Sequence, residues 1–189
     1  MATILGIDPG LTRLGVGVIS HHSGRTVSLV HVEVLRTSPT DRPEARLGAL
    51  SEALENILDF HQPDMVALER VFAQQNLRTV MGTAQISGVV LALAHRRSLP
   101  VSMRTPSEVK AAVTGYGRAD KKQVGTMVQK ILGLDDIPQP ADAADALALA
   151  ISEAWRGGVS PVAAAKGETP AQKAWREAEG RAGQPKLKK

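Results

Sequence analysis

Short apolar runs alternate with turn signals in the first forty residues. Residues 3–7 and 14–19 are aliphatic and often β-branched, and an Asp-Pro-Gly sequence at 8–10 separates them. A valine-rich run follows at 27–36. Runs of this length bounded by turn residues are typical of β-strands. The pattern predicts three successive strands, the first two antiparallel, on one side of a sheet.

The hydrophobic period changes after the third run. From Pro43 to Phe60, leucine and isoleucine recur every three or four residues, which predicts an amphipathic helix. Residues 64–69 form an apolar run that ends in an acid, a pattern typical of a central strand buried on both faces. Residues 76–98 predict a long helix with many small side chains.

The second half of the chain predicts a short strand and further helices. The run VSMR after Pro100 is the strand, and Thr105 or Ser107 is the candidate N-cap of the next helix. A Gly-Tyr-Gly break at 115–117 ends this helix, and Asp120 is the candidate cap of its successor.

The last apolar segment and the tail differ sharply in composition. Residues 141–155 are rich in alanine and predict a final helix, whereas glycine and proline are frequent beyond it and apolar residues are few. Such a composition is typical of disorder. We therefore expect a mixed α/β domain over 1–156 and a basic, disordered tail over 157–189.

Composition excludes several classes of protein. The chain has 189 residues, enough for one domain with its own core, and no cysteine. Disulfide scaffolds, thiol catalysis and cysteine-ligated metals are therefore excluded. No apolar run approaches the ~18 to 20 residues of a membrane span, and the start lacks the pattern of a signal peptide. We expect a soluble, cytoplasmic protein.

The net charge of +4 conceals an uneven distribution. Residues 70–130 contain ten Lys and Arg against only Glu108 and Asp120, whereas residues 1–69 and 131–155 are net negative. Solvated helix faces explain mixed charge in many proteins. The alternative interpretation is a phosphate-binding surface beside a carboxylate-rich pocket, as a metal-dependent nuclease requires.

Four acids are candidates for such a pocket. Asp8 and Glu69 each end an apolar run, and strand ends at the carboxyl edge of a sheet are common sites of chemistry. Asp142 and Asp145 lie three residues apart and therefore project from one face of a helix. Each acid alone also has a structural interpretation. Asp8 is then a turn former, Glu69 an ion-pair partner of Arg70, Asp142 a helix N-terminal acid and Asp145 a solvated residue.

Together the four acids are better explained as a cluster. Carboxylates held close together repel one another unless a cation neutralises them. Oxygen ligation suits Mg²⁺ or Mn²⁺, and two such ions can activate water and stabilise the leaving oxygen of a phosphodiester. The cluster predicts metal-assisted hydrolysis.

Five segments together resemble the RuvC family of Holliday junction resolvases. They are GIDPG (6–10), GVGVI (15–19), ALERVF (67–72), GYGRADKKQV (115–124) and PQPADAADALALA (138–150). The resemblance implies a ribonuclease-H-like α/β fold, with a five-stranded mixed sheet whose first three strands are antiparallel, flanked by helices. It also implies a homodimer that resolves four-way junctions by paired symmetric nicks, leaving 5′-phosphate and 3′-hydroxyl ends, and that works with the RuvA and RuvB branch-migration proteins.

The resemblance assigns roles to individual residues. It implies that Asp8, Glu69, Asp142 and Asp145 are the catalytic acids and bind two Mg²⁺ ions, which Mn²⁺ can replace; some relatives have His at the position of Asp142. The implied DNA-binding residues are Phe72, Lys110, Arg118, Lys121 and Lys122. Tyr116 differs from the family and receives no role. The helix at 76–98 is where the family dimerises, and its small residues Gly82, Ala84 and Gly88 permit close packing.

Three other functions remain open from the residues. Actin-like ATPases and sugar kinases also begin with a strand and a GIDxG turn, but this chain is too short for their two domains. A YqgF-type relative shares the fold, although the ending at 141–150 fits the RuvC family better. A junction-binding protein without cleavage is the third alternative, against which the intact acids argue.

Overall fold

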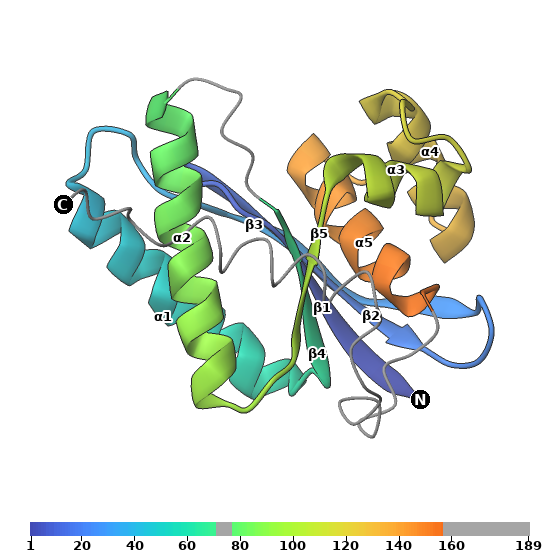
Figure 1. Ribbon diagram of the computed structural model, residues 1–189, viewed down its shortest axis with the longest axis horizontal. Helices are drawn as coiled ribbons and strands as arrows, with labels where there is room; N and C mark the ends of the chain where they lie inside the picture. The colour runs from blue at the N-terminus through green and yellow to red at the C-terminus, as the bar shows by residue number, and fades with distance from the viewer. Residues whose placement is uncertain (71–76, 157–189) are drawn as a thin grey trace, which may run out of the picture. The chain divides into compact units, whose positions relative to one another are not determined.

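A single mixed sheet organises the described residues, 1–70 and 77–156, of the computed structural model (Figure 1). Its spatial order is β3-β2-β1-β4-β5. The strands are β1 (Ala2–Asp8), β2 (Arg13–His21), β3 (Val27–Arg36), β4 (Met65–Glu69) and β5 (Val101–Arg104). β1, β2 and β3 pair antiparallel, whereas β4 runs parallel to both β1 and β5. The expected mixed sheet with three antiparallel strands first is confirmed.

Within residues 1–70 and 77–156, five helices cover the two faces of the sheet. They are α1 (Pro43–His61), α2 (Leu77–Arg96), α3 (Pro106–Thr114), α4 (Lys121–Leu132) and α5 (Ala141–Ala154). α1 and α2 lie on one face, and α3, α4 and α5 lie on the other (Figure 1). None of the described helices is long and apolar enough to cross a bilayer. Residues Met1–Gly158 form one compact unit by their internal contacts.

The alternation of side chains along β1 divides the core into two clusters. Leu5 and Ile7 point to the face covered by α1 and α2, where they pack with buried residues such as Leu54. Ile4 points to the other face and joins the cluster that contains Leu147 of α5. The three side chains of β1 are at most 2% exposed, so β1 is buried on both faces.

Helix α5 lies almost directly on the backbone of the sheet. A Cβ on Gly6 would lie 2.1 Å from the carbonyl oxygen of Ala146, and one on Gly15 would lie 2.2 Å from that of Asp142. Only glycine permits an approach this close. The first turns of α5 are therefore held above the ends of β1 and β2.

Two of the predicted caps form complete capping boxes. The Thr105 hydroxyl accepts from the Glu108 amide while the Glu108 carboxylate accepts from the Thr105 amide, and Asp120 and Gln123 do the same at α4. The hydrogen bonds that the Glu108 carboxylate accepts from the Thr105 amide and hydroxyl lower its pKa. Such caps satisfy amides at the helix starts that would otherwise lack partners. They fix where α3 and α4 begin, and α4 supplies side chains to the site described next.

Candidate active site

Asp8 and Glu69 lie side by side at the carboxyl edge of the sheet. They end the parallel neighbours β1 and β4, and the register that pairs Ile7 with Leu68 places them next to one another. Their side chains share a hydrogen bond. The edge therefore brings together two carboxyl groups from residues 61 positions apart in the chain.

Asp142 and Asp145 complete the cluster from above. Both belong to the beginning of α5, which the glycine contacts hold against β1 and β2. Their side chains are 18% and 27% exposed, so both are partly shielded from water. The structure thus brings all four predicted acids to one place.

Electrostatics shows how closely these acids interact. Burial, and then the charge of Glu69, its hydrogen bond, and the charges of Asp145 and Asp142, raise the pKa of Asp8 to about 8. Burial also raises the pKa of Glu69, although its hydrogen bond with Asp8 and the charges of two nearby lysines act in the opposite direction. Burial and the neighbouring carboxylates thus favour the protonated form of Asp8, and its hydrogen bond with Glu69 is the contact through which the two carboxyl groups share a proton.

Two basic side chains neutralise the other two acids. Lys121 Nζ lies 2.8 Å from Asp145 Oδ2, and Arg13 Nε lies 3.2 Å from Asp142 Oδ2. The hydrogen bond to Asp145 is the main cause that raises the pKa of Lys121. The sequence did not single out Arg13. The signal for it was a basic residue at the start of β2, three residues after the Asp-Pro-Gly sequence.

A cavity of about 340 Å³ opens beside the acids. Asp8, Glu69 and Asp145 line it together with Lys110 and Lys121. The rest of the lining is largely apolar: Pro106, Val109, Val124 and Leu149. Carboxylates and lysines therefore face one space, which agrees with the second of the two interpretations of the charge distribution.

The donor set fits hard divalent cations. Within 1–70 and 77–156, no group of three or more His, Asp or Glu has a metal-binding arrangement as it stands. Instead, Lys121 and Arg13 contact oxygens of Asp145 and Asp142, and Asp8 binds Glu69. Mg²⁺ and Mn²⁺ prefer such oxygens, and a cation would relieve the repulsion that raises the pKa of Asp8. The cluster can hold a cation once these internal partners are exchanged.

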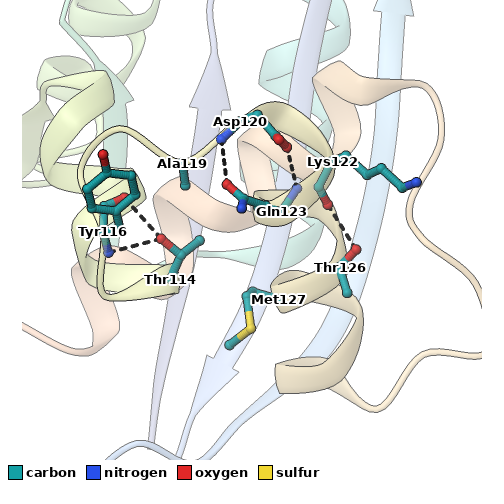
Figure 2. A pocket seen from close by; sticks show the side chains of 8 residues that line it. All are labelled: Thr114, Tyr116, Ala119, Asp120, Lys122, Gln123, Thr126 and Met127. Atoms are coloured by element: carbon teal, nitrogen blue, oxygen red, sulfur yellow. Dashed lines mark hydrogen bonds between the residues drawn. The ribbon is translucent and has the colours of Figure 1, made fainter.

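The remaining predicted residues lie elsewhere. Lys122 lines a separate cavity of about 400 Å³ with Tyr116 and Met127 (Figure 2). Polar groups there bind one another: the Thr114 hydroxyl contacts the Tyr116 backbone, and Asp120 and Gln123 form the α4 cap. Arg118 is exposed in the connection between α3 and α4. Phe72 lies outside the described residues.

One structural interpretation of the acids fails and one holds. The ion pairs of residues 1–70 and 77–156 do not include Glu69 with Arg70. Asp142 does lie in the first turn of α5, where its charge complements the helix dipole. That role is compatible with a place in the acidic cluster.

Comparison with known proteins decides the family. The family model described as crossover junction endodeoxyribonuclease RuvC matches residues 4–153. The chain belongs to the RuvC family. The RuvC of Clavibacter michiganensis subsp. michiganensis is 60% identical over 171 residues, 90% of this chain and 85% of that protein. The RuvC of Saccharopolyspora erythraea is 60% identical over 153 residues, 81% of this chain and 77% of that protein.

Solved structures agree with this assignment. Thermus thermophilus RuvC in complex with a Holliday junction substrate has a TM-score of 0.78 and 35% identity, covering 82% of this chain and 94% of that one. The yeast mitochondrial Holliday junction resolvase, at 17% identity and a TM-score of 0.57, shows the shared fold. The family and the ribonuclease-H-like fold expected from the motifs are confirmed.

Proposed function

We propose that this RuvC-family chain is a structure-selective endonuclease that resolves Holliday junctions in homologous recombination and DNA repair. The observation that carries the proposal is the convergence of Asp8, Glu69, Asp142 and Asp145 at one sheet edge. The named relatives are endonucleases, and the Thermus thermophilus relative has been seen with a junction substrate. Paired symmetric nicks with 5′-phosphate and 3′-hydroxyl ends are the expected products.

The four acids are the proposed ligands of two Mg²⁺ ions, which Mn²⁺ can replace. Such a pair of cations supplies activation of the attacking water and stabilisation of the leaving 3′ oxygen. To bind them, Asp8 gives up its proton and its hydrogen bond to Glu69. Lys121 and Arg13 release Asp145 and Asp142, which frees both basic groups for DNA.

We call the cavity of about 340 Å³ beside the acids the catalytic cavity. Its two lysines are the proposed contacts of the DNA strand that is cut. Lys110 and Lys121 face the same space as three of the acids, so a phosphate there meets both charge types. Arg118 and Lys122 are proposed to bind the backbone farther along the DNA, because they lie outside this cavity. Phe72, for which the motif match is the only support, is proposed to stack on a base at the opened crossover.

A homodimer through α2 is the proposed assembly, because two symmetric nicks need two active sites. Met81 and Leu91 of α2 are 53% and 41% exposed, and Ala84 lies exposed between them. A Cβ on Gly88 would meet open space. This outer face is apolar and has a small residue at its centre, as a closely packed helix pair requires. Gly82 instead faces Leu11, 3.2 Å from a Cβ built on the glycine, and belongs to the core side.

Gly88→Arg is expected to convert the dimer to a monomer. The arginine fits the open space on a single chain, so the fold is retained, whereas it prevents two helices from approaching. Analytical ultracentrifugation should give the parent at twice the 20.0 kDa chain mass and the variant at that mass. Val30→Glu, at a 47% exposed position of β3, is the control and should remain dimeric. A dimeric Gly88→Arg variant would place the interface elsewhere.

The function itself is tested with a synthetic four-way junction and a linear duplex of matched sequence. In Mg²⁺ or Mn²⁺ we expect paired nicks in the junction, sealed by DNA ligase, and no cutting of the duplex. Ligation reports the 5′-phosphate and 3′-hydroxyl ends directly. Equal cleavage of both substrates, or of neither, would contradict the proposal.

Two further family properties belong to the same proposal. We expect the enzyme to act in the cytoplasm together with the RuvA and RuvB branch-migration proteins. Co-sedimentation of the chain with RuvA and RuvB on a four-way junction tests the partnership. Sedimentation of the chain apart from the junction-bound pair would contradict it.

A further inference from the structure

A second, more polar cavity of about 660 Å³ adjoins the catalytic cavity. Asp8 and Lys121 line both of them. From these residues the second cavity follows the turn between β1 and β2 toward α1 and α2, and we call it the turn groove. Its polar lining includes Thr12, Arg13, Arg46, Thr79, Thr83 and Asp142.

Arg46 is held firmly at the wall of the turn groove. Its Nε donates to the Thr37 hydroxyl at 2.9 Å and its Nη2 donates to the Thr12 hydroxyl at 2.7 Å. Thr37 is fixed in turn, because its hydroxyl donates to the Leu11 carbonyl at 2.6 Å and its amide donates to the Thr12 carbonyl at 3.1 Å. The guanidinium therefore has a defined position, and no carboxylate of residues 1–70 and 77–156 pairs with it.

Among the described residues, several N–H and O–H donors of Arg46 and Thr12 have no acceptor. The ion pairs of residues 1–70 and 77–156 do not include Arg46, and a guanidinium has five N–H groups, of which two are used here. The Thr12 oxygen accepts from Arg46, so its hydroxyl hydrogen is directed elsewhere, and the described part of the chain records no acceptor for it. A positive charge beside a spare hydroxyl donor selects for an anion.

We propose that the turn groove binds the phosphodiester backbone of the DNA strand that continues from the catalytic cavity, with Arg46 and the Thr12 hydroxyl as its contacts. Arginine and threonine are common donors to DNA phosphates. The shared lining by Asp8 and Lys121 makes the groove continuous with the site of cutting. The identity of the strand rests on the proposed nuclease function.

With the turn groove as a phosphate site, side chains from helices on both faces of the sheet would contact the DNA. Lys110 and Lys121 come from α3 and α4, whereas Arg46 comes from α1 on the opposite face (Figure 1). Phosphates on either side of the scissile bond are then held by helices that pack on opposite faces of one sheet. Such two-point contact positions the bond over the acids and supports in-line attack.

The test is DNA binding in EDTA, where no cutting occurs. Each phosphate contact contributes about 0.9 to the slope of log K against log salt concentration. Arg46→Gln should weaken binding to a four-way junction about tenfold and make that slope shallower by about 1. Arg42→Gln is the matched control: Arg42 lies four residues away, is exposed and pairs with Glu44, so its slope should equal that of the parent.

Thr12→Val is a second test variant, in which a neutral hydroxyl group is removed instead of a charge. It should weaken binding several-fold with an unchanged salt slope, because the hydroxyl carries no charge. Parental affinity and slope in folded Arg46→Gln, or equal losses in Arg46→Gln and Arg42→Gln, would overturn the proposal. If Arg46→Gln does not fold, parental affinity in Thr12→Val would overturn it.

Failure of the groove and failure of the nuclease proposal give different results. Binding in EDTA reports the groove alone, whereas cleavage in Mg²⁺ reports the four acids. A chain that never cuts junctions but shows the Arg46→Gln slope change retains the groove and loses the resolvase function. A chain that cuts junctions with an unchanged Arg46→Gln slope retains the function and loses the groove.

Discussion

Asp8→Asn is expected to abolish junction cleavage and, in the metal-free protein, to raise thermal stability. Asparagine removes a charged ligand from the acidic cluster, and loss of cation-assisted chemistry costs about a thousandfold in rate or more. Junction binding in EDTA should persist because Lys110, Arg118 and Lys122, which the substitution does not touch, remain. A gel-based cleavage assay in Mg²⁺ and a binding titration in EDTA measure the two effects.

The stability gain follows from the raised pKa of Asp8. Its pKa of about 8 in the folded chain exceeds the ordinary value of 3.8. The folded state therefore binds the proton more tightly, and stability is lost as pH rises from about 4 to about 8. Asparagine does not titrate, so this loss is absent from Asp8→Asn. Its free energy of unfolding should exceed that of the parent by on the order of 2 to 5 kcal/mol at pH 8 and by little near pH 4.

Thermal unfolding in EDTA at several pH values checks this dependence. The expected gain at pH 8 corresponds to a rise in Tm of at least about 5 °C for a domain of this size. Asp136→Asn, at an exposed position before α5, is the matched control and should leave both Tm and cleavage unchanged. A constant Tm difference across pH, or retained cleavage by Asp8→Asn, would contradict the assignment of Asp8.

Arg104→Met is expected to cause the largest loss of stability among single charge changes in the fold. Arg104 of β5 donates through Nε, at 2.8 Å, and through Nη2 to Glu153 Oε2 of α5. Their side chains are only 5% and 4% exposed. Removing the arginine leaves a buried carboxylate without a partner, which costs about 3 to 5 kcal/mol.

Two variants separate the ion pair from general effects. Arg104→Met with Glu153→Leu should recover most of the loss, because a buried pair replaced by apolar residues is often neutral. Arg42→Met breaks the exposed pair with Glu44 and should cost less than about 1 kcal/mol. Urea unfolding measures all three. A loss below about 1 kcal/mol in Arg104→Met would mean that Glu153 finds water or another partner.

The elements of the fold could be predicted because their signals are local. Apolar runs and their period, together with breaks at glycine and proline, placed the strands and helices within a few residues of their observed bounds. Cap preference limited the start of α3 to Thr105 or Ser107, of which Thr105 is the cap, and placed the start of α4 at Asp120. These signals depend on neighbouring residues alone, so tertiary contacts were not needed to interpret them.

The acidic cluster was predictable for a different reason. Residues that end buried parallel strands must meet at one sheet edge, so Asp8 and Glu69 could be paired from their places in the sequence. Which basic side chains lie beside the acids, and which groups these side chains contact, could not be predicted. Arg13 with Asp142, and Arg46 with the Thr12 hydroxyl, are contacts between residues 129 and 34 positions apart. Such contacts depend on how loops and helices pack.

The basic stretch shows a further limit of prediction. Lys121 and Lys122 are adjacent in sequence, yet Lys121 lines the catalytic cavity and Lys122 lines the cavity beside Tyr116 (Figure 2). Successive residues of a helix point about 100° apart, so their destinations differ by the rotation of α4 about its axis. That rotation is set by packing and not by the charge pattern.

The close approach of α5 to the glycines of β1 and β2 has a consequence for metal selectivity. No side chain separates Gly6 and Gly15 from α5, so backbone contact fixes the height of Asp142 and Asp145 above Asp8. Mg²⁺ tolerates little variation in ligand distance, whereas Ca²⁺ accepts longer and less regular coordination. In the proposed two-metal site, the preference among divalent ions would therefore depend in part on glycines that never touch a metal. A methyl group at Gly15 would widen the gap and favour the larger ion.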